Sequence, residues 1–199
     1  MTDNDTTSSP RQAQAAANEG FMRRWSPRSM TGEALTERDL LPLFEAARWA
    51  PSCFNSQPWR FVYALPGTPA WHPTLDLLIE FNQLWAGKAG ALVAIISRTQ
   101  YEASGESAPK HSFDTGAAWM SFALQAQHSG LVTHAMWGFH HDEAKAALNL
   151  SDAYTVEAMV AVGRQGPVSA LPEPFRERET PNERKDLSEL VFAGQMPAE

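Results

Sequence analysis

Apolar residues near the start of the chain recur at helical spacing in a segment that polar signals delimit. Between residues 40 and 47 they return every three or four positions, which predicts an amphipathic helix. Thr36 and Asp39 resemble the capping box that begins a helix, although Asp is one carbon shorter than the usual Glu, and Pro51 ends the segment. We therefore expect a capped helix directly before the loop that begins at Pro51.

The same spacing predicts three more helices further along the chain. One is expected over about residues 74–87, with its apolar side chains near one face, and a short one over residues 141–150. Residues 113–127 are rich in Ala, Leu, Met and Trp, and Gly130, a residue type that often ends helices, follows them. Because this helix is apolar on most sides, we expect it to be central to the core.

Short apolar runs between these helices predict strands. The clearest is residues 91–97, which are apolar at nearly every position, as in a strand buried on both faces. Further strands are expected over residues 60–65, 131–137 and 155–163. Helices and short strands alternate loosely, which favours an α+β or α/β architecture in one domain.

The composition favours a globular protein. Of the 199 residues, 43% are hydrophobic and 20% are charged, which is enough to bury a sizeable core. The net charge of −7 argues against a nucleic-acid partner, because proteins that bind a phosphate backbone usually carry a basic stripe. No apolar run approaches the ~20 residues that a membrane-spanning helix needs, so we expect no membrane association.

Residues 1–20 differ from the remainder of the chain. They are polar and lack the basic and apolar regions of a signal peptide, so we expect a flexible polar arm before a domain formed by residues 21–199. Cys53 is the single cysteine, which excludes an internal disulfide framework and fits a reducing compartment. These features together predict a cytoplasmic protein.

The segment Arg-Arg-Trp-Ser-Pro-Arg-Ser-Met at 23–30 carries the first candidate chemistry. Arg24, Ser26 and Arg28 alternate, so an extended backbone places all three on one side. Two guanidinium groups and a hydroxyl suit a phosphate or another anionic acceptor, because Arg donates through a planar fork. The alternative is a solvated basic segment near the N-terminus.

The loop Trp-Ala-Pro-Ser-Cys-Phe-Asn-Ser-Gln-Pro-Trp-Arg-Phe at 49–61 is unusually rich in small polar groups. Ser52, Asn55 and Gln57 supply donors and acceptors that could read the edge of a planar heterocycle. The alternative is a turn after the helix that satisfies its own backbone through these side chains. The sequence leaves both interpretations open.

The C-terminal region combines charged and apolar residues. Arg184 and Lys185 could close over an anion, although isolated charges are usually solvated. The tail also has four apolar residues that need a surface to cover, so we expect it to dock, for example on a partner subunit. They are Leu187, Leu190, Val191 and Phe192.

Other signals are weaker. Cys53 has no histidine near it in sequence to activate it as a nucleophile. His134, His140 and His141 lack the spacing of zinc ligands, so we predict no metal site. Residues 163–167 contain two glycines but not the dinucleotide-binding fingerprint.

Taken in order, the motifs resemble the FMN-dependent nitroreductase family. Arg-x-Ser-x-Arg followed by Pro-Ser-x-x-Asn-Ser-Gln-Pro-Trp is specific in combination, and the resemblance covers about residues 21–192. The segments that carry it are 23–30, 49–61, 81–97, 137–139 and 183–190. The resemblance implies an α+β fold, with a mixed sheet surrounded by helices, built as an intertwined homodimer. It also implies two FMN molecules at the dimer interface, each lined by both chains.

The resemblance assigns the basic residues to the two ends of FMN. Arg24 and Ser26 would hold its phosphate and ribityl chain, and Arg184, with Lys185 beside it, would be a further phosphate contact. Arg28 would approach the pyrimidine edge of the flavin. A fixed cation there would favour the reduced form and raise the reduction potential.

The remaining cofactor residues are implied to surround the ring. Asn82 matches a position that hydrogen-bonds the flavin, and Gly138 matches a close backbone approach near its central ring. The other protomer would supply the polar loop, through Pro51, Ser52, Cys53, Asn55 and Gln57. No catalytic side chain is predicted, because FMN carries the chemistry.

The sequence departs from the family pattern around the expected acceptor pocket. Trp137 stands where some members have a glutamate, and Trp85 stands where a basic residue is often found. Serine is common at the position of Cys53, whose redox role the sequence leaves open. We therefore expect Trp85 and Trp137 to form an aromatic substrate pocket that prefers flat, hydrophobic acceptors.

The implied activity is reduction of nitroaromatics, quinones or similar acceptors by NADH or NADPH, in a ping-pong mechanism. Two alternatives remain open at this point. One is an FMN enzyme of the same fold with another redox reaction, such as ene reduction, dehydrogenation or dehalogenation. The other is a protein that binds or senses FMN without catalysis.

Overall fold

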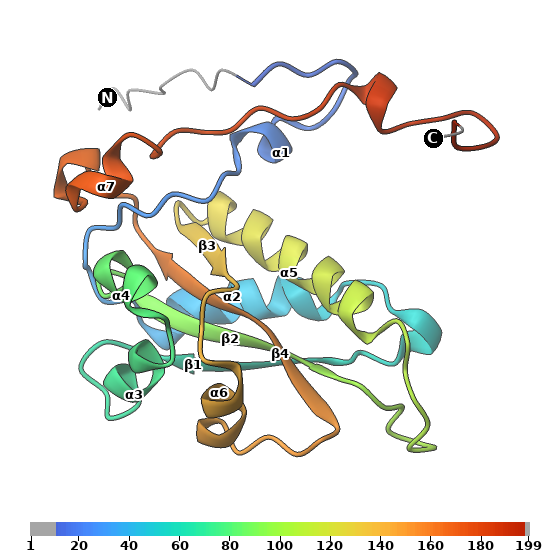
Figure 1. Cartoon of the computed structure of the whole chain (residues 1–199), viewed down its shortest axis with the longest axis horizontal. Coiled ribbons are helices and arrows are strands. Elements are labelled where there is room, and N and C mark those ends of the chain that lie inside the picture. The colour runs from blue at the N-terminus through green and yellow to red at the C-terminus, as the bar shows by residue number, and fades with distance from the viewer. Residues whose placement is uncertain (1–10, 198–199) are drawn as a thin grey trace.

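The computed structural model describes residues 11–197 of the chain. Its centre is a four-stranded sheet in the order β1-β2-β4-β3, and all neighbouring strands pair antiparallel (Figure 1). The strands are β1 (Trp59–Ala64), β2 (Ala91–Arg98), β3 (Val132–Met136) and β4 (Tyr154–Gly163). The α+β class is confirmed, although the resemblance implied a mixed sheet and the pairings described within this chain are antiparallel.

Helices cover both faces of the sheet. The longest are α2 (Glu37–Arg48) and α5 (His111–His128), which pack on one face together with Val93 and Ile95 of β2. Leu92 and Ile96, which alternate with them, face the smaller helices on the other side. Those helices are α3 (Trp71–Asp76), α4 (Glu80–Ala86), α6 (His141–Ala147) and α7 (Glu173–Arg176). The sheet is therefore the middle of three layers, with one hydrophobic cluster on each side.

The predicted capped helix is confirmed as α2. The side chains of Thr36 and Asp39 form the reciprocal contacts of a capping box, and the helix ends at Arg48, three residues before Pro51. The four predicted strands are also present, each within two residues of its expected bounds.

The prediction of one continuous helix over residues 74–87 is wrong. The structure has two short helices there, α3 and α4, separated by residues 77–79. Leu78 forms an isolated bridge with Phe139, and the backbone N–H of Ile79 donates to Gly138 O at 3.2 Å. These contacts occupy the backbone groups that a continuous helix would use internally.

The central position predicted for residues 113–127 is also only partly correct. Gly130 does adopt a left-handed backbone, with φ of +69°, just after α5. However, α5 covers one face of the sheet, and Phe113 on its outer side is 79% exposed. The apolar outer surface therefore lacks a cover within the described chain.

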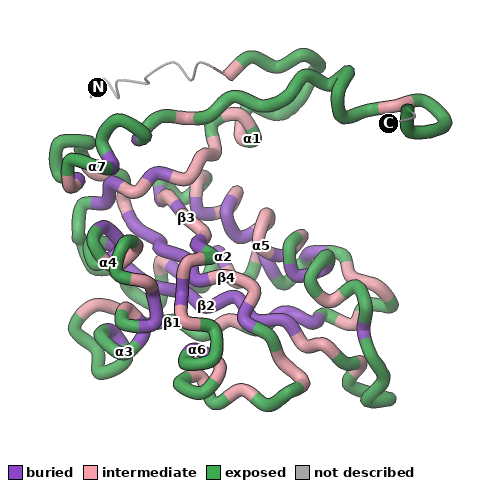
Figure 2. Tube along the Cα trace, in the orientation of Figure 1, coloured by how far each residue is buried: buried purple, intermediate pink, exposed green. Residues whose placement is uncertain are grey.

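Both ends of the described chain run together beyond the globular body. Residues 11–18 lead into α1 (Glu19–Arg23) beside the C-terminal segment, and both are mostly exposed (Figures 1 and 2). The Gln14 side chain contacts Asp186 and accepts from the N–H of Leu187 at 2.7 Å. The flexibility expected for residues 1–20 falls partly on residues 1–10, which lie outside the described residues.

The C-terminal region contains two 3₁₀ turns, η2 (Val168–Ala170) and η3 (Leu187–Glu189). Within the described chain, Leu187, Leu190 and Val191 remain exposed. The surface that the apolar tail was expected to cover is therefore not provided by the body of the same chain.

Candidate functional site

Arg24 and Ser26 lie on an extended segment directly after α1, as the alternation of the sequence predicts. Arg24 ends α1 with an extended backbone, and its Nη1 donates to Ser26 Oγ at 3.3 Å. Both side chains are half-buried. Their burial argues against a purely solvated basic segment, the alternative that the sequence left open.

Two further arginines gather at this place from the ends of the chain. Arg11 Nη1 donates to the backbone oxygen of Arg24 at 2.7 Å, and Arg11 Nε donates to that of Asn182 at 2.7 Å. Arg184 Nη1 donates to the same Asn182 oxygen at 3.3 Å. One carbonyl thus links the guanidinium groups of Arg11 and Arg184.

The three guanidinium groups repel one another. The pKa of Arg24 is lowered by burial and then by the charges of Arg11 and Arg184. Burial and Arg184 also lower the pKa of Arg11, and Glu183 offsets part of that effect. Within residues 11–197, neither Arg24 nor Arg184 forms an ion pair with a carboxylate. Such a cluster favours a bound anion, which would relieve the repulsion.

Arg28 lies further along the same extended segment. The backbone N–H groups of Arg28 and Ser29 both donate to Glu179 Oε1 at 2.7 Å. Glu179 is only 5% exposed, so its carboxylate fixes this backbone from inside the protein. The guanidinium carbon lies 6.0 Å from the ring centroids of Trp85 and Phe175, and the buried Nε has no hydrogen-bond partner among the described residues.

The structure corrects the expectation that Trp85 lines the acceptor pocket. Trp85 is 1% exposed and belongs to the core, where its indole lies below Arg28 and 4.7 Å from the ring of His134. The helical position that the sequence offered to a ligand faces inward, because α4 turns this face toward the sheet. Trp85 therefore supports Arg28.

His134 of β3 adjoins the arginine segment. Its Nδ1 lies 3.3 Å from the backbone oxygen of Pro27. Burial, followed by the charge of Arg28, lowers the pKa of His134 to about 4. This histidine is therefore neutral at physiological pH and adds no further positive charge beside Arg24 and Arg28.

The structure brings Asn82 and Gly138 into contact, and packing alone already requires glycine at position 138. Asn82 Nδ2 donates to Gly138 O at 2.9 Å, which leaves the amide oxygen to accept from a ligand. A Cβ at Gly138 would lie 2.7 Å from Asn82 Nδ2 and 2.8 Å from Ile79 Cδ1. The space that glycine leaves at this position is thus filled by α4 and the residue before it.

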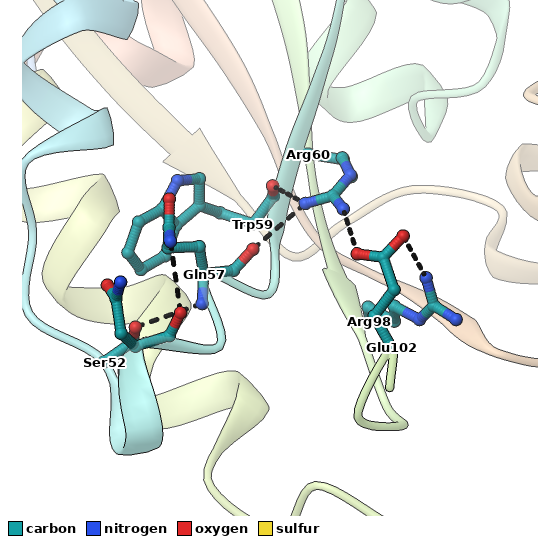
Figure 3. A network of polar contacts seen from close by, with 7 residues as sticks. Ser52, Gln57, Trp59, Arg60, Arg98 and Glu102 are labelled. Carbon is teal, nitrogen blue, oxygen red and sulfur yellow. Dashed lines mark hydrogen bonds and ion pairs between the residues drawn. The ribbon is translucent and has the colours of Figure 1, made fainter. Parts of the chain in front are cut away.

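The polar loop satisfies much of its own backbone. The N–H of Gln57 donates to Ser52 Oγ at 3.0 Å, and Gln57 Nε2 donates to Asn55 O at 3.1 Å (Figure 3). Arg60 at the start of β1 donates to the backbone oxygen of Gln57 and lies 3.7 Å from Glu102. The self-satisfying turn that the sequence left open is therefore present for Ser52 and Gln57.

The loop is nevertheless strained and open to solvent. It contains the 3₁₀ turn η1 (Cys53–Asn55), and Phe54, Asn55 and Gln57 have φ values of +53°, +54° and +46°. Left-handed backbone at residues other than glycine costs of order 1–3 kcal/mol each and is typical of functional loops. Phe54 is 89% exposed, and Pro51 and Asn55 are also exposed. The loop thus presents these residues outward.

The loop and the arginine segment lie at opposite ends of α5. The N–H of Cys53 donates to Asp114 Oδ2 at 2.9 Å, in the first turn of this helix. Arg24 lines a cavity of about 410 Å³ together with Gln127, near its last turn. At a rise of 1.5 Å per residue, Asp114 and Gln127 are about 20 Å apart. A single chain therefore does not unite the two halves of the predicted site.

The remaining predicted residues are exposed. Trp137 is 72% exposed and lies 4.4 Å from His141 between ring centroids, so it offers an accessible aromatic surface. Lys185 lines a cavity of about 780 Å³ together with Arg11 and Arg184. No group of metal-ligating side chains is found in the described part of the chain, and none of its helices is long and apolar enough to cross a membrane.

Sequence reasoning missed Arg11 and Glu179. Both act on residues more than a hundred positions away in sequence, and neither belongs to a recognisable local pattern. The only available signal was that Glu179 ends a run of alternating charges at 176–179, and such a run is a common feature of solvated surfaces.

Comparisons with known proteins identify the relatives of the chain. The model of the nitroreductase family matches residues 21–68. The crystal structure of an oxidoreductase containing FMN is 39% identical, covers 98% of this chain and 100% of its own, and superimposes with a TM-score of 0.92. An uncharacterised 15.4 kDa protein of Mycolicibacterium smegmatis is 31% identical over 61% of this chain and 81% of its own length. MhqN of Bacillus subtilis, provisionally named an NAD(P)H nitroreductase, is 24% identical over 77% of this chain and 90% of its own length. With these relatives, the chain belongs to the nitroreductase family.

Proposed function

We propose that this protein binds FMN and uses NADH or NADPH to reduce nitroaromatics, quinones or similar flat acceptors. The observation that carries the proposal is the cluster of Arg11, Arg24 and Arg184, which favours a phosphate-like anion beside a half-buried segment. The relative with a TM-score of 0.92 contains FMN. The name of MhqN supports a nicotinamide nucleotide as the electron donor.

The residues present fit a ligand with a phosphate at one end and a polar planar ring at the other. Arg24, Ser26 and Arg184 would hold the phosphate, with Lys185 nearby. Arg28 retains a buried Nε–H without an acceptor, and Asn82 retains its amide oxygen. When bound, FMN supplies the capacity to take up hydride and pass it on. Arg28 would stabilise negative charge on the ring at fixed geometry.

We further propose a homodimer in which each site combines Arg24 of one chain with the 51–57 loop of the other. Support comes from the distance of about 20 Å along α5 that separates the loop from Arg24 within one chain. Because of this distance, one chain alone does not bring the loop and Arg24 into the same site. Symmetric pairing would then create two equivalent sites. Pro51, Ser52, Cys53, Asn55 and Gln57 would join the site in this way.

The proposal is tested by a visible absorption spectrum of the purified protein, followed by anaerobic addition of NADH and then NADPH. We expect a flavin spectrum that one donor bleaches and that a quinone or nitroaromatic restores. In the ping-pong order that we propose, the oxidised nucleotide leaves before the acceptor binds, so initial-rate plots should be parallel. No flavin after reconstitution with FMN would contradict the proposal, and flavin that neither donor bleaches would contradict the donor assignment.

Replacing Trp137 with Ala should change acceptor choice more than FMN affinity. The exposed indole offers a stacking surface, and loss of about 1.4 kcal/mol of aromatic contact corresponds to about tenfold. We expect kcat/KM for an aromatic quinone to fall about tenfold relative to ferricyanide, while the FMN Kd stays within about twofold. Trp49→Ala, at an exposed tryptophan after α2, is the matched control. An unchanged acceptor ratio in Trp137→Ala would contradict this role.

A further inference from the structure

The N-terminal arm has a specific attachment to the proposed phosphate site. Arg11 is half-buried, whereas residues 12–19 are exposed. Its guanidinium donates to three backbone oxygens, those of Met22 at 3.2 Å, Arg24 at 2.7 Å and Asn182 at 2.7 Å. One side chain therefore connects the arm, the end of α1 and the C-terminal segment.

These three acceptors lie at or beside the two residues that we propose as phosphate ligands. Arg24 is itself an acceptor through its backbone, and Asn182 is two positions before Arg184 and is shared by both arginines. The C-terminal segment near Arg184 is exposed, so contacts between neighbouring residues of this segment do little to fix the position of Arg184. Arg11 supplies a link between Arg24 and Arg184 that spans more than 150 positions of sequence.

A second contact, made by Gln14, holds the arm against the C-terminal segment. Gln14 bonds both the side chain of Asp186 and the N–H of Leu187. The arm and the C-terminal segment together line the cavity of about 780 Å³ that contains Arg11, Arg184 and Lys185. Its lining also includes Glu183 and Asp186, so the three basic residues leave the cavity with an excess positive charge that a bound anion would offset.

We propose that Arg11 is a positioning residue for the phosphate of FMN, through which the N-terminal arm clamps Arg24 and Arg184 into one anion site. The inference rests on the proposed function and adds a segment outside the family resemblance, which begins at residue 21. It requires that Arg11 act on phosphate binding and leave recognition of the flavin ring unchanged.

Riboflavin, which has the same ring and no phosphate, separates these two effects. Apoprotein of the wild type and of Arg11→Gln is titrated with FMN and with riboflavin by flavin fluorescence, in phosphate-free buffer. We expect Arg11→Gln to raise the FMN Kd by about tenfold or more, since a charge-assisted contact is typically worth 1.5–3 kcal/mol. The riboflavin Kd should remain within about twofold.

Arg23→Gln is the matched control. It removes the same charge one residue from Arg24, but Arg23 is exposed and paired with Glu19, and its FMN Kd should stay near that of the wild type. Gln14→Ala removes the second contact of the arm without changing its charge, and it replaces Arg11→Gln in the test if that variant does not fold. We expect Gln14→Ala to raise the FMN Kd and to leave the riboflavin Kd unchanged. Arg11→Lys should recover only part of the loss, because an ammonium cannot reproduce the fork.

The outcomes are distinct. A selective loss of FMN affinity supports the clamp. Equal losses for FMN and riboflavin, or no loss in Arg11→Gln, overturn it while leaving the proposed function intact. A wild-type protein that binds neither flavin overturns both proposals.

Discussion

The double variant Arg24→Ala/Arg184→Ala is expected to be purified without colour and to bind FMN at least 100-fold more weakly than the wild type. Each arginine would contribute a charge-assisted hydrogen bond to the phosphate, typically worth 1.5–3 kcal/mol, and a loss of about 3 kcal/mol already exceeds 100-fold. The FMN Kd is measured by fluorescence titration of the apoprotein. Retention of stoichiometric FMN would refute the placement of the phosphate at these two residues.

A control variant with the same change in charge separates a local effect from a general one. Arg38→Ala/Arg178→Ala removes two exposed arginines from outside the proposed site. Its FMN Kd should match that of the wild type within about twofold. A circular dichroism melt of both double variants identifies any loss of affinity that arises from unfolding.

Acidification should destabilise the protein through His134. Burial and the charge of Arg28 lower its pKa to about 4, whereas the unfolded chain has a pKa near 6.5. The unfolded state therefore takes up the proton first, and the free energy of unfolding falls as the pH decreases from about 6.5 to about 4. Between pH 7.5 and 5 this group alone should remove about 2 kcal/mol, as measured by urea denaturation of the apoprotein.

The assignment is checked by removing the titrating group. The free energy of unfolding differs between pH 7.5 and pH 5, and His134→Gln should reduce this difference by about 2 kcal/mol, whatever its effect on stability at pH 7.5. His72→Gln, at an exposed position in α3, should leave the difference unchanged. Equal pH dependence in the wild type and His134→Gln would show that another group is responsible.

Elements defined by local signals could be predicted, and those defined by distant contacts could not. The capping residues Thr36 and Asp39 and the apolar run 91–97 specify α2 and β2 without help from the remainder of the chain. The break between α3 and α4 depends on pairing between Leu78 and Phe139, which lie 61 positions apart in sequence. Periodicity alone cannot reveal such a bridge.

The candidate site shows the same division. Alternation in an extended segment correctly places Arg24 and Ser26 together, because it requires only local backbone geometry. The burial of Trp85 depends on which face of α4 meets the sheet, and the contribution of Arg11 depends on a C-terminal segment 171 residues away. Those facts follow from tertiary packing and had no counterpart in the motifs.

The separation of the arginine segment and the polar loop by the length of α5 has a genetic consequence. In the proposed dimer, a copy of the gene with a damaged arginine segment and a copy with a damaged loop would each be inactive alone. Mixed dimers would contain one site in which both defects meet and one site assembled from the two intact halves. Two defective alleles could therefore complement each other in one cell, although both affect the same gene.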